Sequence, residues 1–163
     1  MTPTDNRTGV LFVCLGNICR SPLAEGVFLC LAGKRRIADR FDVDSCGTGG
    51  WHVGEAPDPR TIEVATKHGV RLPSIARVLD PHEDFTRFGW IIPMDRQNKH
   101  DLLAEGAPAA RVRLLRSYDP ALAGAPEEEL DVPDPYWDEA DGFDLVYEMI
   151  RAACVGMLAE LTE

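Results

Sequence analysis

The chain has 163 residues, of which 45% are hydrophobic, and a formal net charge of −10. This length and apolar content suit one compact domain over 1–163 with a single core, and they exclude a chain that is disordered by composition. The negative charge argues against nucleic acid and against an anionic membrane surface as partners, because both are bound by clustered Lys and Arg. A site for an anion must therefore be positive locally.

Nothing near the N-terminus reads as a targeting segment. Residues 1–7 are polar and expected to be disordered, and the apolar run from Gly9 to Cys14 is too short for a signal-peptide core or a spanning helix. The cysteines are odd in number and lack the spacing of a disulfide framework, so free thiols in a reducing cytoplasm are expected. They are Cys14, Cys19, Cys30, Cys46 and Cys154.

The hydrophobic pattern predicts strands that alternate with helices. Val10 to Val13 is a short, fully apolar run, typical of a strand buried on both faces. A helix is expected from about Arg20 to Leu31, with Pro22 in its first turn. A second strand is expected from Arg40 to Ser45. A glycine-rich loop then leads to a helix from about Asp58 to His68.

The second half of the chain continues the alternation. Trp90 to Ile92 is predicted as a third strand, Asp95 to Glu105 as a helix and Val112 to Leu115 as a fourth strand. A long acidic segment rich in proline follows, and then a last helix over about 143–162 with its apolar residues on one face. The prediction is an α/β fold: a four-stranded parallel sheet with helices on both faces, flavodoxin-like, in strand order 2-1-3-4.

The segment that leaves the first strand carries the candidate chemistry, because ligands of such sheets bind beyond the carboxyl ends of the strands. It runs from Cys14 to Pro22 and places a thiol at a strand end and Arg20 at a helix start. Backbone N–H groups of the loop and first helical turn can converge on an anion there, and the planar fork of Arg20 can hold two phosphate oxygens. These positive surroundings favour a thiolate, and Gly16 and Asn17 tolerate unusual backbone angles.

By itself, a Cys six residues before an Arg is a weak pattern: Cys14 could be a small buried residue and Arg20 a surface charge. Its place between a buried strand and a helix start favours the anion-binding interpretation. The complete segment resembles the signature loop of the low-molecular-weight protein tyrosine phosphatases, C-x-G-N-x-C-R-S-P. Later blocks of that family follow in the same order, so the resemblance covers nearly the whole chain. They are Trp51-His52-Val53-Gly54, Asp58-Pro59-Arg60, His68-Gly69-Val70, Met94-Asp95-Arg96 and Asp134-Pro135-Tyr136.

The resemblance implies a protein tyrosine phosphatase that hydrolyses phosphotyrosine and other aryl phosphate monoesters through a phosphocysteine intermediate. It implies Cys14 as the nucleophile, Arg20 as the clamp on the transferring phosphoryl group and Ser21 as a hydroxyl donor to the thiolate. The loop residues implied to bind the substrate are Leu15, Gly16, Asn17, Ile18, Cys19 and Ser21.

The resemblance also implies that Asn17 holds the loop in a strained shape through hydrogen bonds. Its expected partners are Ser21, Ser45 and His68. For His68 there is a simpler role, since a histidine at a helix C-terminus interacts favourably with the helix dipole. The two roles are compatible.

A thiolate that attacks phosphorus expels an alkoxide or phenoxide, so a general acid is needed. The segment from Val132 to Trp137 offers Asp134, which stands between two stiffening prolines. The residues alone leave rivals, since so acidic a run is usually a solvated surface. The resemblance favours Asp134 as general acid and then as base for the water that releases phosphate. The rivals are Asp131, Asp138, Glu139 and Asp141.

Aromatic residues in loops are expected to wall the entrance, because a phenyl phosphate needs apolar sides to its slot. These are Trp51, Tyr136 and Trp137. Many members of the family have a second Tyr where this chain has Trp137. The departure removes one possible phosphorylation site and leaves the chemistry intact.

Other functions stay open at this point. Arsenate reductase, which some relatives of this fold perform, needs further cysteines on a mobile segment, whereas Cys30, Cys46 and Cys154 fall within or at the ends of predicted elements. A non-catalytic phosphate-binding module would need neither Cys14 nor Asp134. No metal-ligand spacing is visible, so neither a metal nor a cofactor is expected. The expected partners are proteins that carry phosphotyrosine, and the chain is expected to be a monomer.

A redox switch is a further expectation. A reactive thiolate at Cys14 is readily oxidised to a sulfenic acid, and Cys19 lies five residues on in the same tight loop. Paired cysteines at these positions are typical of the family, so the resemblance supports a reversible Cys14–Cys19 disulfide. The alternative is that Cys19 only fills space under the loop.

Overall fold

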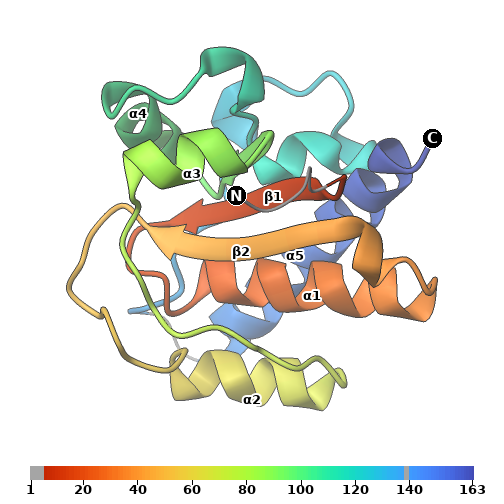
Figure 1. The fold of residues 1–163 in the computed structure, drawn as a ribbon. Coiled ribbons are helices and arrows are strands. Elements are labelled where there is room, and N and C mark those ends of the chain that lie inside the picture. The colour runs from red at the N-terminus through yellow and green to blue at the C-terminus, as the bar shows by residue number, and fades with distance from the viewer. Residues whose placement is uncertain (1–5, 138–139) are drawn as a thin grey trace.

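The computed structural model describes residues 6–137 and 140–163, and in it a parallel sheet lies between two layers of helices (Figure 1). The helices are α1 (Arg20–Lys34), α2 (Pro59–Lys67), α3 (Pro81–Arg87), α4 (Arg96–Ala104) and α5 (Ala140–Leu161). Figure 1 shows α1, α2 and α5 on one face of the sheet and α3 and α4 on the other. The predicted α/β layering, with helices on both faces, is confirmed.

The sheet has the order β2-β1-β3, and both pairings are parallel. The central strand β1 (Thr8–Cys14) pairs along its whole length with β2 (Phe41–Gly47) and, over Val10 to Val13, with β3 (Trp90–Pro93). Each of these strands overlaps a run that the sequence predicted as a strand; β2 begins one residue after the predicted start at Arg40 and ends two residues after the predicted end at Ser45. Because the strands are parallel, Cys14 and the turn that follows β3 lie at the same edge of the sheet.

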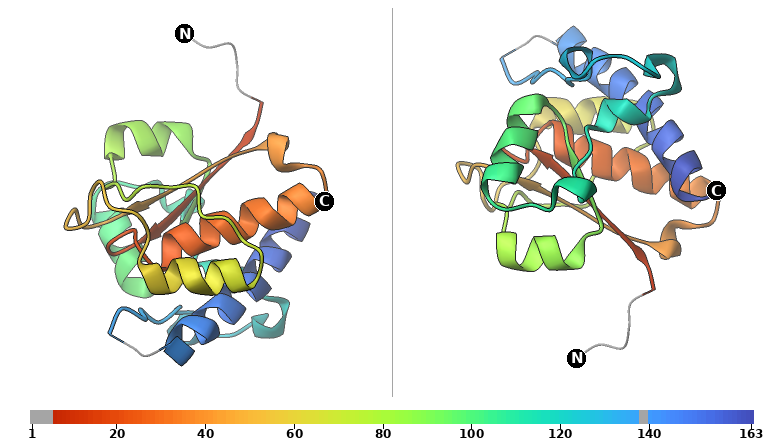
Figure 2. Two further views of the ribbon diagram at one scale, coloured as in Figure 1. Left: turned by 90° about the horizontal axis from the view of Figure 1, so that it is seen from below. Right: turned by 90° about the horizontal axis from the view of Figure 1, so that it is seen from above.

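The predicted fourth strand over Val112 to Leu115 is reduced to a single parallel bridge between Val112 and Ile91 of β3. Its position beside β3 agrees with the predicted order 2-1-3-4. The ladder ends there because the chain turns into a 3₁₀ helix, Leu115–Tyr118, which packs against α5 (Figure 2). The apolar side chain of Leu115 is fully buried in the core. The chain turns so that this side chain can be buried, and the strand pairing with β3 therefore stops.

Helix α3 is an element that the sequence reasoning missed. Its seven residues contain one large apolar side chain, Phe85, so the segment shows no helical period. The available signal was local: Asp80 accepts a hydrogen bond from the backbone of Glu83 as the N-cap, and Pro81 follows at the first helical position. The other helices begin and end within three residues of the predicted bounds.

The side chains of β1 alternate between two buried clusters, as strand geometry requires. Val10, Phe12 and Cys14 belong to the larger cluster, with α1 and α5, whereas Leu11 and Val13 belong to the smaller one, with Leu102 of α4. Cys14 is therefore directed to the face of the sheet on which α1 begins.

The termini and surface add two facts. Of the segment 1–7, predicted to be disordered, residues 1–5 lie outside the described residues, and Asn6 and Arg7 are exposed. Within the described part of the chain, none of the helices has the length and apolar character that crossing a membrane requires.

Candidate active site

The loop 15–19 connects Cys14, the last residue of β1, to Arg20, the first residue of α1. Asn17 has a φ of 58°, in the left-handed region that Asn tolerates better than most residues. Cys19 stands just before α1, and its side chain makes no capping hydrogen bond within the described chain. The N–H groups of the first helical turn are thus left for an anion, and the helix dipole favours one there.

The chain that follows β2 supports this loop from one side. Thr48 and Gly49 donate their backbone N–H groups to the carbonyl oxygens of Cys14 and Leu15, each at 2.9 Å. Gly47 makes the approach possible, because a Cβ atom at this position would come within 2.7 Å of the Leu15 carbonyl oxygen. The first glycine of the glycine-rich segment therefore serves close packing against the loop.

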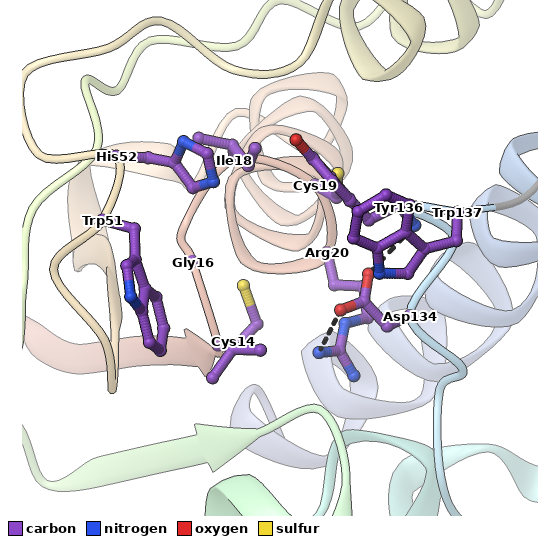
Figure 3. A pocket seen from close by; sticks show the side chains of 11 residues that line it. Cys14, Gly16, Ile18, Cys19, Arg20, Trp51, His52, Asp134, Tyr136 and Trp137 are labelled. Atoms are coloured by element: carbon purple, nitrogen blue, oxygen red, sulfur yellow. Dashed lines mark hydrogen bonds and ion pairs between the residues drawn. The ribbon is translucent and has the colours of Figure 1, made fainter.

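A cavity of about 220 Å³ opens above the loop (Figure 3). In Figure 3 the Cys14 sulfur lies between Trp51 and His52 on one side and Asp134 and Tyr136 on the other. The residues that line the cavity are Cys14, Leu15, Gly16, Ile18, Cys19, Arg20, Trp51, His52, Asp134, Tyr136 and Trp137.

The three predicted catalytic residues and the three predicted aromatic walls all belong to this lining. Trp51 is 70% and Trp137 is 89% exposed, so these two form the outer rim. The side chains of Asn17 and Ser21, two of the residues expected to bind the substrate, are buried and do not line the cavity. His52 is a lining residue that the prediction lacked, although it stands next to Trp51 in a block that matched the family.

The sulfur of Cys14 is buried and lies 3.0 Å from the Ser21 hydroxyl oxygen. That oxygen accepts a hydrogen bond of 2.8 Å from Asn17 Nδ2, so its own proton is free for the sulfur. The competing acceptor, the carbonyl oxygen of Cys46, is farther away at 3.4 Å. A hydroxyl that donates to sulfur stabilises the thiolate form, which is the nucleophilic form.

Asn17 is held at both ends of its amide. Its Nδ2 also donates to Ser45 Oγ at 3.0 Å, and its Oδ1 accepts from the backbone N–H of Arg77 at 2.9 Å. The prediction of His68 as a partner is wrong: His68 is exposed at the end of α2, where its ring stacks on Tyr147 of α5 with 3.8 Å between centroids. The stacking on α5 holds this ring at the helix end and away from the loop.

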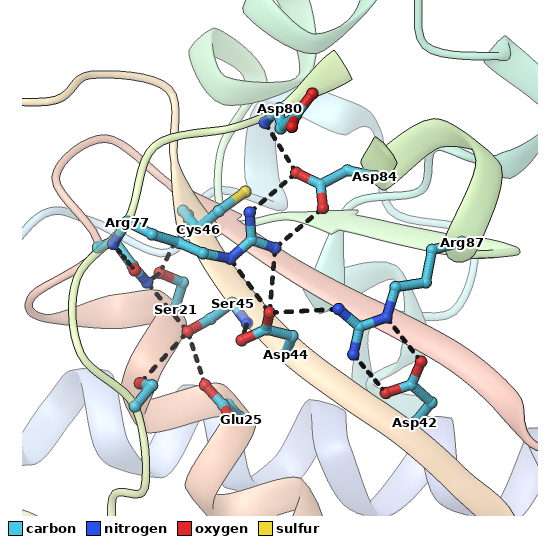
Figure 4. A network of polar contacts seen from close by, with 12 residues as sticks. Ser21, Glu25, Asp42, Asp44, Ser45, Cys46, Arg77, Asp80, Asp84 and Arg87 are labelled. Atoms are coloured by element: carbon cyan, nitrogen blue, oxygen red, sulfur yellow. Dashed lines mark hydrogen bonds and ion pairs between the residues drawn. The ribbon is translucent and has the colours of Figure 1, made fainter. Parts of the chain in front are cut away.

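The network continues from Ser45 to a buried carboxyl group (Figure 4). Ser45 Oγ donates to Glu25 Oε1 at 2.6 Å, and Glu25 is only 4% exposed. Burial raises the pKa of the Glu25 carboxyl to about 7, against the hydrogen bond from Ser45, which lowers it. On the other side, the guanidinium of Arg77 binds the buried Asp84 at 3.0 Å and Asp44 at 3.1 Å, which anchors the segment that holds Asn17.

Arg20 is a buried cation, 2% exposed, that is held from three directions. Its Nη1 donates to Asp95 Oδ2 at 2.6 Å and to the carbonyl oxygen of Val132 at 2.9 Å, and its Nη2 lies 3.6 Å from Asp134 Oδ2. Burial alone lowers the pKa of Arg20, but the negative charges of Cys14 and the two aspartates outweigh it and raise that pKa. The sequence reasoning assigned no role to Asp95, although it follows β3 at the edge of the sheet where the site was expected.

The loop that carries Asp134 is fixed upstream and internally. Val132 donates its N–H group to the Met94 carbonyl oxygen at 2.8 Å. Asp134 itself accepts from the N–H group of Tyr136 at 3.0 Å, an Asx-type turn that leaves its other oxygen toward Arg20. Arg116 adds bonds of 3.2 Å to the carbonyl oxygens of residues 129 and 131.

The rival acids that the structure describes lie outside the cavity. Asp131 is paired with Arg96 at 2.9 Å; although burial acts in the opposite direction, the hydrogen bonds from Arg96 lower the pKa of Asp131. Asp141 is exposed in the first turn of α5, and Asp138 and Glu139 lie outside the described residues. Among the described rivals, none lines the cavity.

The remaining cysteines differ among themselves in burial and in access to the cavity. Burial raises the pKa of Cys19, which lines the cavity, to about 12. Cys46 and Cys154 are fully buried, and Cys30 is half-buried on α1. In the part of the chain that the structure describes, no group of three or more His, Cys, Asp or Glu side chains could hold a metal ion.

Comparison with known proteins agrees with this geometry. Residues 9–163 match the family model described as low molecular weight phosphotyrosine protein phosphatase. A Streptomyces coelicolor protein named low molecular weight protein-tyrosine-phosphatase is 46% identical over 158 residues, 94% of this chain and 93% of the relative.

Solved structures agree as well. A protein tyrosine phosphatase from Entamoeba histolytica superposes with a TM-score of 0.87 at 31% identity, covering 95% of this chain and 97% of that one. A Drosophila arginine phosphatase superposes with a TM-score of 0.84 at 32% identity, covering 94% and 98%. The match over residues 9–163 and the relative with 46% identity leave one assignment: the chain belongs to the low-molecular-weight phosphotyrosine protein phosphatase family.

Proposed function

We propose that the protein hydrolyses phosphotyrosine in proteins, and aryl phosphate monoesters in general, through a phosphocysteine on Cys14. One observation carries the proposal: a single cavity holds a sulfur that lies 3.0 Å from the Ser21 hydroxyl, a buried guanidinium and a carboxyl group 3.6 Å from it. These are the nucleophile, the phosphate clamp and the acid that the reaction needs.

In the first step the phosphate oxygens bind to the N–H groups of the loop and to Arg20. The Cys14 thiolate attacks phosphorus in line, an S–P bond forms, and the P–O bond to the phenol breaks. The leaving oxygen takes its proton from Asp134, which starts the step as a carboxylic acid. Asp95 keeps the Arg20 fork in one orientation throughout, since its hydrogen bond of 2.6 Å is on the side of Nη1.

In the second step the Asp134 carboxylate takes a proton from water, and the oxygen of that water attacks phosphorus. The S–P bond breaks, inorganic phosphate leaves, and the electron pair returns to the Cys14 sulfur. The Ser21 hydroxyl, which has its oxygen occupied by Asn17 at 2.8 Å, donates to the thiolate as it forms. The same hydroxyl therefore stabilises the thiolate before it attacks phosphorus and again when it leaves phosphorus.

The walls favour an aryl ester. Trp51 and Tyr136, together with Leu15 and Ile18 of the loop 15–19, give the slot apolar sides that match a phenyl ring. The resemblance to an arginine phosphatase makes N-phosphoarginine the second candidate substrate. Its guanidinium is polar, and Asp134 is the acidic side chain of the lining that could pair with it, so we rank it below phosphotyrosine.

Two alternatives from the sequence have less support. An arsenate reductase would pass a disulfide to further cysteines on a mobile segment, but Cys46 and Cys154 are fully buried inside β2 and α5, and Cys30 is half-buried within α1. A phosphate-binding module would need neither Cys14 nor Asp134 in the same cavity.

We further propose that the enzyme works as a monomer in the cytoplasm on phosphotyrosine-containing proteins. The nucleophile, the clamp and the acid already meet within one copy of the chain, so the proposed chemistry does not require a second copy. A reducing compartment keeps Cys14 as the free thiol that the reaction needs. Sedimentation of the purified protein and fractionation of cells test these two points.

The activity is tested with matched peptides that carry phosphotyrosine, phosphoserine or phosphoarginine, in excess chelator. We expect a clear preference for phosphotyrosine, and a protein adduct of one phosphoryl group when the reaction is quenched by rapid denaturation. The Cys14→Ser variant should be inactive. Full activity of that variant would overturn the mechanism, and a preference for phosphoarginine would overturn the substrate.

A further inference from the structure

The start of α2 contains a closely bonded pair. Asp58, the N-cap of α2, accepts from the backbone N–H of Arg60 at 2.9 Å. It also binds the Arg60 guanidinium with both oxygens, at 3.0 Å from Nε and 2.9 Å from Nη2. The hydrogen bonds from Arg60 lower the pKa of Asp58 despite its partial burial, so the pair is ionic near neutral pH. The helix start and the Arg60 side chain are thus fixed as one unit.

This unit is attached to the loop 15–19, which follows Cys14 and is called the nucleophile loop below. The backbone N–H of Asp58 donates to the carbonyl oxygen of Ile18 at 2.8 Å. Ile18 lines the cavity two residues before Arg20. The Asp58–Arg60 pair therefore has one bonded end on the loop that holds Cys14.

The other end of the Asp58–Arg60 pair is bonded to the segment from Val132 to Trp137, which carries Asp134 and is called the acid loop below. Arg60 Nη2 donates to the carbonyl oxygen of Tyr136 at 2.9 Å, and the N–H of the same Tyr136 donates to Asp134 Oδ1 at 3.0 Å. The guanidinium also lies over the ring of Tyr136, 5.7 Å from its centroid, and over that of the buried Phe143, 4.5 Å away. Arg60 thus holds the loop on the downstream side of Asp134, whereas Arg20 and Met94 hold it upstream through Val132.

We propose that Arg60 is a positioning residue for the reaction: it keeps the acid loop in register with the nucleophile loop, and its effect on catalysis passes through Asp134. The inference rests on the proposed function of Asp134 as general acid. In-line transfer requires the thiolate on one side of phosphorus and the acid at the leaving oxygen on the other, so the separation of the two loops decides the geometry. An error of about 1 Å in such an arrangement costs on the order of 10²-fold in rate.

Arg60→Ala is the first test, with kcat/KM measured for aryl phosphates that differ in leaving-group pKa. A displaced acid matters most for a poor leaving group. We therefore expect a loss of at least about 10-fold on phenyl phosphate and on phosphotyrosine, and much less on an activated nitrophenyl ester. Arg60→Lys keeps the charge but cannot bridge Asp58 and Tyr136 at once, so it should show the same selective loss.

Arg87 offers a matched control. It binds Asp42 with two hydrogen bonds of 2.8 and 2.7 Å and lies 4.6 Å from the Phe88 ring centroid, as Arg60 does with its own partners, but on the opposite layer at α3. Arg87→Ala should keep the wild-type dependence on the leaving group. Thermal unfolding of all variants separates a loss of folded protein from a loss of rate, and Arg60→Lys serves if Arg60→Ala does not fold.

The decisive measurement is the double variant with Asp134→Asn. If Arg60 acts through Asp134, adding Arg60→Ala to Asp134→Asn causes no further loss in kcat/KM. Additive losses, or an equal loss on all leaving groups, would overturn the inference and leave Arg60 as a structural or substrate-binding residue. If Asp134→Asn alone lowers kcat/KM equally for all leaving groups, or not at all, Asp134 is not the general acid. The inference for Arg60 is then wrong as well.

Discussion

Arg20 and Asp95 are joined by a hydrogen bond of 2.6 Å between Nη1 and Oδ2, although 75 residues separate them in the chain. The other carboxylate oxygen of Asp95 accepts from the Asn98 N–H at 2.8 Å and caps α4. One side chain thus sets both the start of a helix and the direction of the phosphate clamp.

Asp95→Asn separates these two roles. Asn is as good an N-cap as Asp, so the helix start is retained, but its amide cannot replace the charge beside Arg20. A hydrogen bond to a charged group contributes about 1.5–3 kcal/mol, so we expect kcat/KM for aryl phosphates to fall about 10- to 100-fold. Inhibition by inorganic phosphate should weaken in parallel, and both are measured by steady-state kinetics.

Asp80→Asn is the control for Asp95→Asn, because Asp80 caps α3 in the same manner and lies outside the cavity lining. It should leave kcat/KM unchanged. If Asp95→Asn behaves like this control, the orientation of Arg20 does not depend on its carboxylate partner.

The sequence predicted what is local and missed what tertiary contacts bring together. The nucleophile loop is one continuous segment, so its thiol and guanidinium could be read directly. Asp95 and His52 come from other segments, and only the folded chain brings them to the site. The prediction for His68 failed because an aromatic contact with Tyr147 decides its direction, and that contact crosses from α2 to α5.

The same limit applies to the sheet. Val112 was correctly expected at the edge beside β3, since the alternation of elements requires it. The length of the strand could not be predicted, because a segment as short as Val112 to Leu115 fits a strand and a buried turn equally well. The 3₁₀ helix that begins at Leu115 packs against α5, and this packing stabilises the turn instead of a longer strand.

Asp134→Asn should lower kcat/KM by roughly 10²–10⁴-fold on phosphotyrosine and less on activated aryl esters. The reason is that Asn has no proton to give to the leaving oxygen, whereas a good leaving group needs none. Profiles of rate against pH for both proteins check the assignment, because the fall in rate on the alkaline side, where the general acid has lost its proton, should disappear in Asp134→Asn.

Asp131→Asn is the matched control for the acid, three residues upstream. Its carboxylate pairs with Arg96 and lies outside the cavity lining. We expect it to keep the wild-type dependence on the leaving group. A reversed result for the two variants would move the acid to Asp131.

Glu25→Gln should make the stability of the protein less dependent on pH. Because burial raises the pKa of Glu25 from 4.5 to about 7, the folded state binds a proton there more tightly than the unfolded state. The contribution of Glu25 to the free energy of unfolding is fully present below pH 4.5 and is lost as pH rises to about 7. The free energy of unfolding falls by about 3 kcal/mol over this range. The charged neighbours of Glu25 are Asp44 and Arg77.

Urea unfolding of both proteins at several pH values between 5 and 8 gives the comparison. The Gln side chain can still accept from Ser45, so the variant should gain on the wild type as pH rises. Glu63→Gln, an exposed change on α2, should show no such gain. Parallel stability curves for Glu25→Gln and the wild type would contradict the prediction.

Peroxide should convert Cys14 to a sulfenic acid, and Cys19 should then displace water to form a Cys14–Cys19 disulfide. Burial raises the pKa of Cys19 to about 12, so its thiol is neutral at pH 7 and the thiolate that attacks is scarce. Disulfide formation should therefore be slow at neutral pH and faster at pH 9. A quenched time course with mass spectrometry of the thiols measures this rate.

Cys19→Ser decides whether the pair protects the enzyme. After peroxide, the wild type should recover its activity with dithiothreitol, because two electrons from the dithiol restore both thiols. The variant should lose activity permanently as Cys14 proceeds to the sulfinic acid, which a dithiol cannot reduce. Bound inorganic phosphate should protect both proteins, since it occupies the cavity above the sulfur. Equal recovery of the two proteins would assign Cys19 to packing alone, in keeping with its burial.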